Sequence, residues 1–107
     1  MKYTVEFTAG ARQDLLKLHR YIAKAGRSQT ANQLIDDISK ACKALSENPE
    51  RGHIPSEIEG LTNFVCRQIV IKNYRIVYQI LGKVVVIFGV IDGRRNFRDV
   101  MRQRQML

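Results

Sequence analysis

Two very short connections in the last third of the chain constrain its fold more than any other feature. Residues 63–71, 74–80 and 83–92 are rich in Val, Ile and Tyr, which favour strands. Only two residues separate each segment from the next, Lys72-Asn73 and then Leu81-Gly82. Because a parallel crossover needs about a dozen residues or more, the three strands must pair antiparallel. The Asn and the Gly of these dipeptides tolerate the positive φ angles that tight turns require.

The strands differ in how their faces are covered. Residues 83–91 are almost all apolar, which predicts a central strand with both faces buried. Residues 2–7 alternate apolar and polar side chains, so we expect a half-buried strand at the start of the chain. The long stretch of chain between this first strand and the later strands allows it to lie parallel to the last strand or to the penultimate one.

Two helices are predicted between the first strand and the meander, because apolar residues recur there every three or four positions. We expect Thr8 to cap the first helix and Gly26 to end it. Ser28 is expected to cap the second helix, which ends at Asn48-Pro49. A connection of about three residues forces the two helices into an antiparallel hairpin. Residues 48–62 are interrupted by prolines and glycines, and we expect an irregular surface loop there.

A short C-terminal helix or tail completes the predicted fold. Residues 94–105 can form an amphipathic helix with Phe97, Val100 and Met101 on one side. The fold class is therefore α+β: an N-terminal strand, an antiparallel two-helix hairpin, a three-stranded antiparallel β-meander and this tail, with both helices on one sheet face. The chain has 107 residues and 45% hydrophobic content, so residues 1–107 are expected to form one domain.

Charge indicates the kind of partner. The formal net charge is +8 and the isoelectric point is about 9.9, which favours anionic partners such as nucleic acid or an acidic protein. The longest apolar run, residues 84–91, is far shorter than the ~20 residues of a membrane-spanning helix. The N-terminal residues do not resemble a signal peptide, so we expect a cytoplasmic protein. Cys42 and Cys66 lie in apolar stretches and are expected to be buried free thiols.

The usual catalytic and metal-binding patterns are absent from the sequence. His19 and His53 are the only histidines, and neither has a cysteine at metal-ligand spacing, so we expect no metal and no cofactor. We expect His19 to be a packed or surface side chain. His53 could act as a base, but we expect no nearby residue to orient it.

Arginine is the residue type best able to form a functional surface in this chain. Guanidinium groups bind phosphates and carboxylates bidentately and stay charged at any cellular pH. Because neighbouring strands bring their residues to within about 5 Å, we expect the C-terminal arginines to converge at one end of the sheet. They are Arg67, Arg75, Arg94, Arg95, Arg98, Arg102 and Arg104. Tyr74 and Tyr78 are expected to be core residues rather than platforms for base stacking.

Three segments of this region resemble the RelE/ParE superfamily of type II toxin–antitoxin toxins: YRIVYQI at 74–80, VVVI at 84–87 and GRR at 93–95. The upstream strand, helices and loop agree, so the resemblance covers almost the whole chain. It implies a small basic bacterial toxin, held inactive by a cognate antitoxin whose C-terminal segment wraps across it. We expect that segment to be acidic and to dock in the groove between the helical hairpin and the sheet, rimmed by the arginines.

The resemblance leaves two branches of the superfamily open. RelE-like toxins cut messenger RNA in the ribosomal A site with basic residues and a general acid or base, often a tyrosine near the C-terminus. ParE-like toxins share the fold, lack that set of residues and poison DNA gyrase. Arg75 and Arg95 match arginines of the nuclease. Met101 stands where the tyrosine would fall and Gln68 where a strand lysine would, and methionine cannot transfer a proton.

We therefore predict a ParE-like toxin that inhibits gyrase and arrests growth, with no catalytic residue. The antitoxin or the target is expected to contact Arg67, Arg75, Arg94, Arg95, Arg98 and Arg102. The alternative is a RelE-like ribosome-dependent endoribonuclease in which Arg75 and Arg95 grip the scissile phosphate. A third possibility is a non-toxic basic module that binds nucleic acid.

Overall fold

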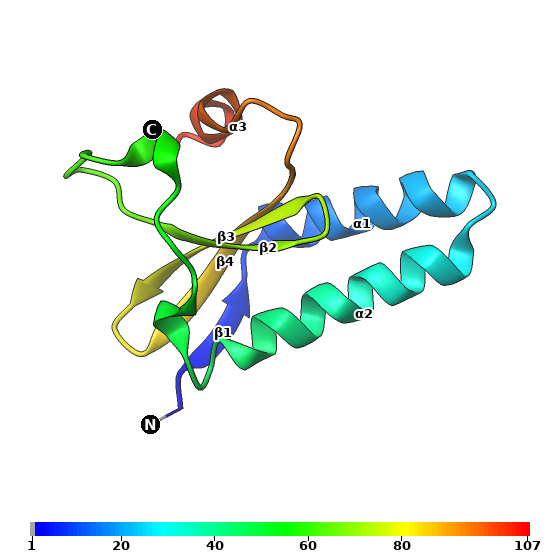
Figure 1. Cartoon of the computed structure of the whole chain (residues 1–107), viewed down its shortest axis with the longest axis horizontal. Coiled ribbons are helices and arrows are strands. Elements are labelled where there is room, and N and C mark those ends of the chain that lie inside the picture. Colours follow the sequence, from blue (N-terminus) through cyan, green and yellow to red (C-terminus); the bar gives the residue numbers. More distant parts are fainter. Residues whose placement is uncertain (1) are drawn as a thin grey trace.

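The computed structural model describes residues 2–107 and confirms the predicted α+β class (Figure 1). A strand, two helices, three strands and a short helix follow in the expected order. They are β1 (Thr4–Phe7), α1 (Ala9–Lys24), α2 (Ser28–Ala44), β2 (Arg67–Ile71), β3 (Tyr74–Leu81), β4 (Val84–Asp92) and α3 (Phe97–Gln103). Two single-turn 3-10 helices, Pro49–Arg51 and Ser56–Ile58, lie between α2 and β2.

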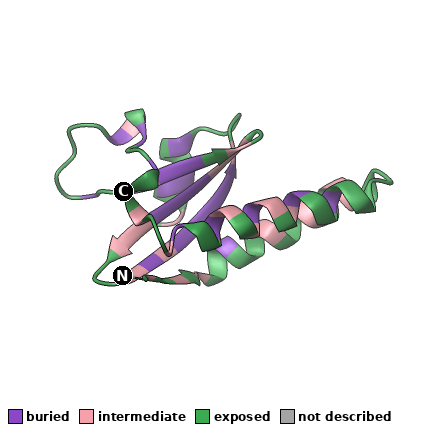
Figure 2. Cartoon of the chain, turned by 60° about the horizontal axis from the view of Figure 1, so that its bottom comes forward, coloured by how far each residue is buried: buried purple, intermediate pink, exposed green. Residues whose placement is uncertain are grey.

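The strands of the described chain form one sheet in the order β1-β4-β3-β2. β1 lies parallel to β4, with Val5 opposite Val85, as the long connection through both helices permits. β3 lies antiparallel to both β4 and β2, with Arg75 opposite Val70. β4 is therefore internal and mostly buried, which confirms the predicted central strand (Figure 2).

Different elements cover the two faces of the sheet. The α1–α2 hairpin lies on one face, and its distal half projects past the sheet (Figure 1). The core on this side packs Ile38 of α2 against Ile76 and Ile87 of the sheet. On the other face, α3 and the segment before β2 bury a second core in which Phe97 packs with Val77. Both long helices thus share one face, as predicted.

The first helix begins and ends as predicted, whereas the second does neither, because α2 already ends at Ala44, before the predicted Asn48-Pro49. Thr8 Oγ1 accepts a hydrogen bond from the Ala11 N–H at 3.1 Å, so Thr8 caps α1. Beyond the end of α1, Gly26 has φ +78°, a left-handed conformation that favours glycine. The prediction that Ser28 caps α2 is wrong, because the turn is so tight that Ser28 is already helical and Arg27 holds the cap position without a side-chain bond. None of the helices in residues 2–107 combines the length and hydrophobicity needed to cross a bilayer.

Two strand boundaries also differ from the prediction. The strand expected from residue 63 begins only at Arg67, because Phe64 and Cys66 pack into the core beside α3 instead of pairing with β3. The second turn is residues 82–83 rather than 81–82, since Leu81 still pairs with Val84. In the first turn the positive φ, 54°, falls on Lys72 and not on its asparagine neighbour.

The segment 48–62 is more ordered than the expected irregular loop. The fully buried Tyr78 hydroxyl donates to the Pro49 carbonyl at 2.7 Å and accepts from the Gly52 N–H at 2.9 Å. Glycine is required at position 52, because a Cβ there would lie 2.5 Å from the Tyr78 hydroxyl oxygen. These bonds attach the loop to β3, and Tyr78 is a core residue as predicted.

Candidate functional site

Arg75 lies at the centre of a polar cluster on the α3 face of the sheet. Only 13% of its side chain is exposed. Its two terminal nitrogens donate to the two carboxylate oxygens of Glu57 at 2.7 and 2.8 Å, which makes a bidentate ion pair. The guanidinium carbon also lies 4.5 Å from the centroid of the Phe97 ring, a cation–π contact. Arg75 is therefore neutralised and held in place by the loop before β2 and by α3.

A histidine joins this cluster through Gln68. Arg75 Nε donates to Gln68 Oε1 at 2.6 Å, which sets the orientation of the amide. Gln68 Nε2 lies 3.0 Å from His53 Nε2. Because an amide nitrogen can only donate, His53 Nε2 accepts, and the proton of the neutral imidazole sits on Nδ1. The expectation that no residue orients His53 is wrong: Gln68 does so, and backbone hydrogen bonds of 3.0 and 2.8 Å also join the two residues.

Glu57 is the acidic member of this group. Hydrogen bonding from Arg75 holds the pKa of the Glu57 carboxyl below its ordinary value, against the opposing effect of partial burial. The Arg98 guanidinium donates to the Glu57 backbone carbonyl at 3.0 and 3.3 Å. We name Glu57, Gln68, Arg75 and His53 the Arg75 cluster. Of the predicted arginines, Arg98 is the one that the structure brings to it, and an anion could reach Arg75 only by displacing Glu57.

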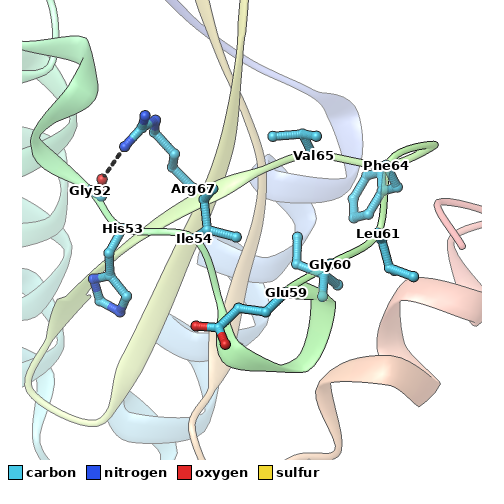
Figure 3. Close-up of a pocket in the computed structure, with 10 residues that line it drawn as sticks. Gly52, His53, Ile54, Glu59, Gly60, Leu61, Phe64, Val65 and Arg67 are labelled. Carbon is cyan, nitrogen blue, oxygen red and sulfur yellow. Dashed lines mark hydrogen bonds between the residues drawn. The ribbon is translucent and has the colours of Figure 1, made fainter.

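Arg67 lies on the opposite face of the sheet from Arg75. Its partner across the strand pair is Tyr78, which belongs to the core beneath the helical hairpin. Because side chains alternate along a strand, Arg67 and Arg75 cannot converge, and that expectation is wrong. Arg67 donates to the Gly52 carbonyl at 2.7 Å and lines an open pocket of about 530 Å³ (Figure 3). Exposed apolar side chains of the same pocket are Ile54, Leu61 and Val65.

The remaining tail arginines are not gathered into one surface. Arg94 forms an ion pair with Asp92 at 2.8 Å, and its hydrogen bonds lower the pKa of Asp92 to about 2. Arg102 pairs with Asp99 at 3.2 Å, one turn away on α3. Arg95 is exposed and belongs to none of the ion pairs within residues 2–107. The single arginine surface that we expected is not formed.

Arg104 has a structural role in the fold. It donates to both carboxylate oxygens of Asp14, at 2.8 and 2.5 Å, and to the Phe88 carbonyl at 3.0 Å. Asp14 also accepts from the Val90 N–H at 2.9 Å. Arg104 thereby ties the end of α3 to α1 and β4.

A second depression, of about 340 Å³, lies where α1 meets the end of β4. Lys17 and Tyr21 of α1 line it together with Arg94 and Arg95. The other lining residues are Asp14, Leu18, Tyr74, Val90 and Asp92. This is the part of the predicted groove between hairpin and sheet that bears tail arginines. Lys17 and Tyr21 were absent from the predicted site, although their four-residue spacing places them on neighbouring turns of one helix side.

The described residues offer few groups for chemistry. No three His, Cys, Asp or Glu side chains in residues 2–107 are grouped so that they could hold a metal ion. Cys42 and Cys66 are buried free thiols, as expected, and desolvation raises the pKa of each to about 12. His19 contacts Asn32 of α2 at 2.7 Å. Met101 is fully buried in the core beside α3.

Comparisons with known sequences agree on one group of proteins. The sequence model of the ParE toxin of the type II toxin–antitoxin system parDE matches residues 5–97. A curated Escherichia coli protein described as a RelE-like toxin is 32% identical over 101 residues, which cover 94% of this chain and 90% of that protein.

Solved structures of both branches share the fold. The chromosomal ParDE system of P. aeruginosa has a chain that matches with a TM-score of 0.71 at 19% identity, over 85% of this chain and 96% of that one. A free E. coli RelE mutant matches with a TM-score of 0.66 at 19% identity, over 100% of both chains. The RelBE2 complex of Mycobacterium tuberculosis matches with a TM-score of 0.58 at 27% identity, over 86% and 92%. The fold alone therefore does not separate ParE-like from RelE-like proteins.

Proposed function

We propose that this chain, which belongs to the ParE toxin family of type II toxin–antitoxin systems, inhibits DNA gyrase and thereby arrests growth. ParE-like toxins are the gyrase-directed branch of the RelE/ParE superfamily. Such a poison acts by binding, so it needs a fixed recognition surface and no residue that transfers protons. We place the protein in the cytoplasm, beside that target.

One observation carries the choice of gyrase over the ribosome. Met101 occupies the position where RelE-like nucleases often have a tyrosine that moves protons. Its side chain is fully buried and has no titratable group, so it can neither reach a substrate nor act as an acid or base. Arg75, which would grip the scissile phosphate, is already neutralised by a bidentate bond to Glu57. Both features favour a toxin that binds its target without cutting RNA.

The test is a pair of reactions with one preparation of toxin. In the first, purified gyrase supercoils relaxed plasmid with ATP, and we expect toxin to block supercoiling and to leave linear DNA. In the second, ribosomes hold a messenger RNA, and we expect no cleavage. Cutting of the messenger RNA with gyrase unaffected would contradict the proposal.

We also propose a cognate antitoxin as the partner that inactivates the toxin. Two of the structural neighbours come from toxin–antitoxin systems of P. aeruginosa and M. tuberculosis. An acidic antitoxin segment suits the depression at Arg94 and Arg95, because Arg95 is exposed and free of ion pairs within residues 2–107. Added antitoxin should restore supercoiling in the gyrase reaction.

A RelE-like endoribonuclease is the second candidate, and one observation favours it. His53 is oriented by Gln68, which in turn contacts Arg75, so an imidazole and a guanidinium lie in one connected cluster. In that case His53 would serve as the base, and His53→Ala would abolish ribosome-dependent cleavage while leaving the fold intact. Family membership as a toxin argues against the third possibility, a non-toxic basic module.

A further inference from the structure

Helix α1 carries several exposed cations that none of the ion pairs within residues 2–107 neutralises. This helix carries four cations, Arg12, Lys17, Arg20 and Lys24, and one carboxylate, Asp14. Asp14 is already neutralised by Arg104. None of the ion pairs within residues 2–107 involves a cation of α1, whereas tail arginines 94, 102 and 104 are all paired.

Three of these cations form a straight stripe on the outer side of the helix. At 3.6 residues per turn, Lys17, Arg20 and Lys24 lie within about 60° of one another, directed away from the buried Ala11. All three are exposed. The distal half of α1 projects past the sheet, so no other described element lies over its outer side (Figure 1). We name Lys17, Arg20 and Lys24 the α1 stripe.

The stripe continues onto the sheet through the depression at the end of β4. Lys17 lines that depression together with Arg95, which belongs to none of the ion pairs within residues 2–107. Tyr21, whose exposed fraction is 74%, borders the same place. A row of cations therefore runs from Lys24 along α1 to Arg95.

We propose that the α1 stripe, extended by Arg95, binds the phosphate backbone of duplex DNA. Lys17 and Lys24 are separated by about 10 Å along the helix axis. Over that length the axis of a DNA duplex passes about three phosphates of each strand, at a rise of about 3.4 Å each. A rigid helix can therefore meet successive phosphates without the rearrangement that flexible cations require.

Duplex DNA fits this surface better than a single strand does. Proteins that hold single strands stack successive bases on several aromatic side chains. Tyr21 is the one aromatic residue in the exposed class among residues 2–107, and Tyr74 is half-buried. The surface thus offers charge without a row of stacking platforms.

This inference deepens the proposed function and rests on it for one point only, the source of the DNA. Gyrase holds duplex DNA while it acts, and a toxin that also contacts that DNA would bind the gyrase–DNA complex more tightly than gyrase alone. DNA binding by the free toxin can be measured without gyrase. The two ideas can therefore fail separately.

The experiment measures binding of full-length toxin to a fluorescent DNA duplex of about 20 base pairs across a salt series. The stripe variant is Lys17→Glu, Arg20→Glu and Lys24→Glu. The matched control is Lys2→Glu, Lys43→Glu and Arg51→Glu, which changes the net charge equally at the opposite end of the molecule, where α2 ends. Circular dichroism checks that both variants are folded.

We expect the control to bind within about threefold of the wild type, and the stripe variant at least about tenfold more weakly at ~50 mM salt. The slope of log affinity against log salt should fall by about 3 in the stripe variant, one unit for each lost phosphate contact. Equal losses in the two variants would overturn the proposal, because net charge alone would then explain binding. Tighter binding of the matching single-stranded RNA would overturn the choice of duplex DNA.

Two further outcomes separate the claims. If the stripe variant loses affinity for the antitoxin but not for DNA, the surface is the antitoxin's and the inference falls. If the wild-type toxin inhibits gyrase without binding free DNA, the inference falls and the proposed function stands. If the toxin binds free DNA but leaves gyrase unaffected, the proposed function falls and the inference stands.

Discussion

The hydroxyl of Tyr78 joins two parts of the chain through one buried oxygen. It donates to Pro49 and accepts from Gly52, so the loop after α2 depends on it. Tyr78→Phe should lower the free energy of unfolding by about 1–3 kcal/mol, because the buried Gly52 N–H and the partly buried Pro49 carbonyl both lose their partner. Urea unfolding followed by circular dichroism measures this. Tyr21→Phe is the control and should change stability by less than about 0.5 kcal/mol, since Tyr21 is exposed.

The Glu57–Arg75 ion pair should make stability depend on pH in the acid range. Since the folded-state pKa of Glu57 is lowered from its ordinary value of 4.5, the carboxylate stabilises the fold above that pH. This contribution is lost as pH falls through the folded-state pKa. Glu57→Gln should therefore be less stable than the wild type near pH 7, with a difference that shrinks below pH 4.5. A constant difference from pH 7 to pH 3 would show that the ion pair is not the cause.

Some of these residue contacts could be predicted from the sequence and others could not. The alternation of side chains along β2 and β3 already places Arg67 and Arg75 on opposite faces, so their failure to converge was predictable. The hydrogen bonds that connect His53, Gln68 and Arg75 were not predictable. They depend on how the loop before β2 runs along the edge of that strand, and the sequence of this loop has no hydrophobic periodicity. Burial of Cys42, Cys66 and Tyr78 followed directly from their apolar surroundings.

At the scale of elements, two residues that look alike in sequence have different roles. Thr8 precedes α1 and Ser28 opens α2, but only the Thr8 side chain accepts a hydrogen bond from the first turn of its helix. Thr8→Ala should destabilise the protein by about 1 kcal/mol, the usual cost of losing a cap. Ser28→Ala should change stability little, because alanine suits a helical position and no cap bond is lost. Thermal or urea unfolding of the two variants compares them, and equal losses would contradict the assignment of the caps.

The order and pairing of the elements were predictable because each depends on local pattern. Two-residue turns required the antiparallel meander, and the apolar run of β4 required a central place in the sheet. The apolar side of α3, Phe97, Val100 and Met101, is buried as its spacing predicts. The late start of β2 was not predictable, since burial of Phe64 and Cys66 beside α3 satisfies their hydrophobicity without strand pairing.

At the scale of the whole molecule, the distribution of charge matters more than its total. The net charge of +8 could be read from the sequence, and it predicts an anionic partner. The location of the unpaired charge could not be read from the sequence, because it depends on which arginines form an ion pair with a carboxylate in the folded protein. Most of the tail arginines form an ion pair, as Arg94 and Arg104 illustrate, whereas the residues of the α1 stripe form none. Exposed cations without an ion pair are therefore available on α1, and not only on the tail, which carries five of the eleven arginines.

The central claim is that this toxin stops growth by binding gyrase and not by cutting RNA. The most direct measurement induces the toxin in cells without its antitoxin, then follows chromosome integrity on pulsed-field gels and messenger RNA ends in the same samples. We predict double-strand breaks in the chromosome at the onset of growth arrest, with transcripts uncut. An intact chromosome together with messenger RNAs cleaved at codon boundaries would contradict the account.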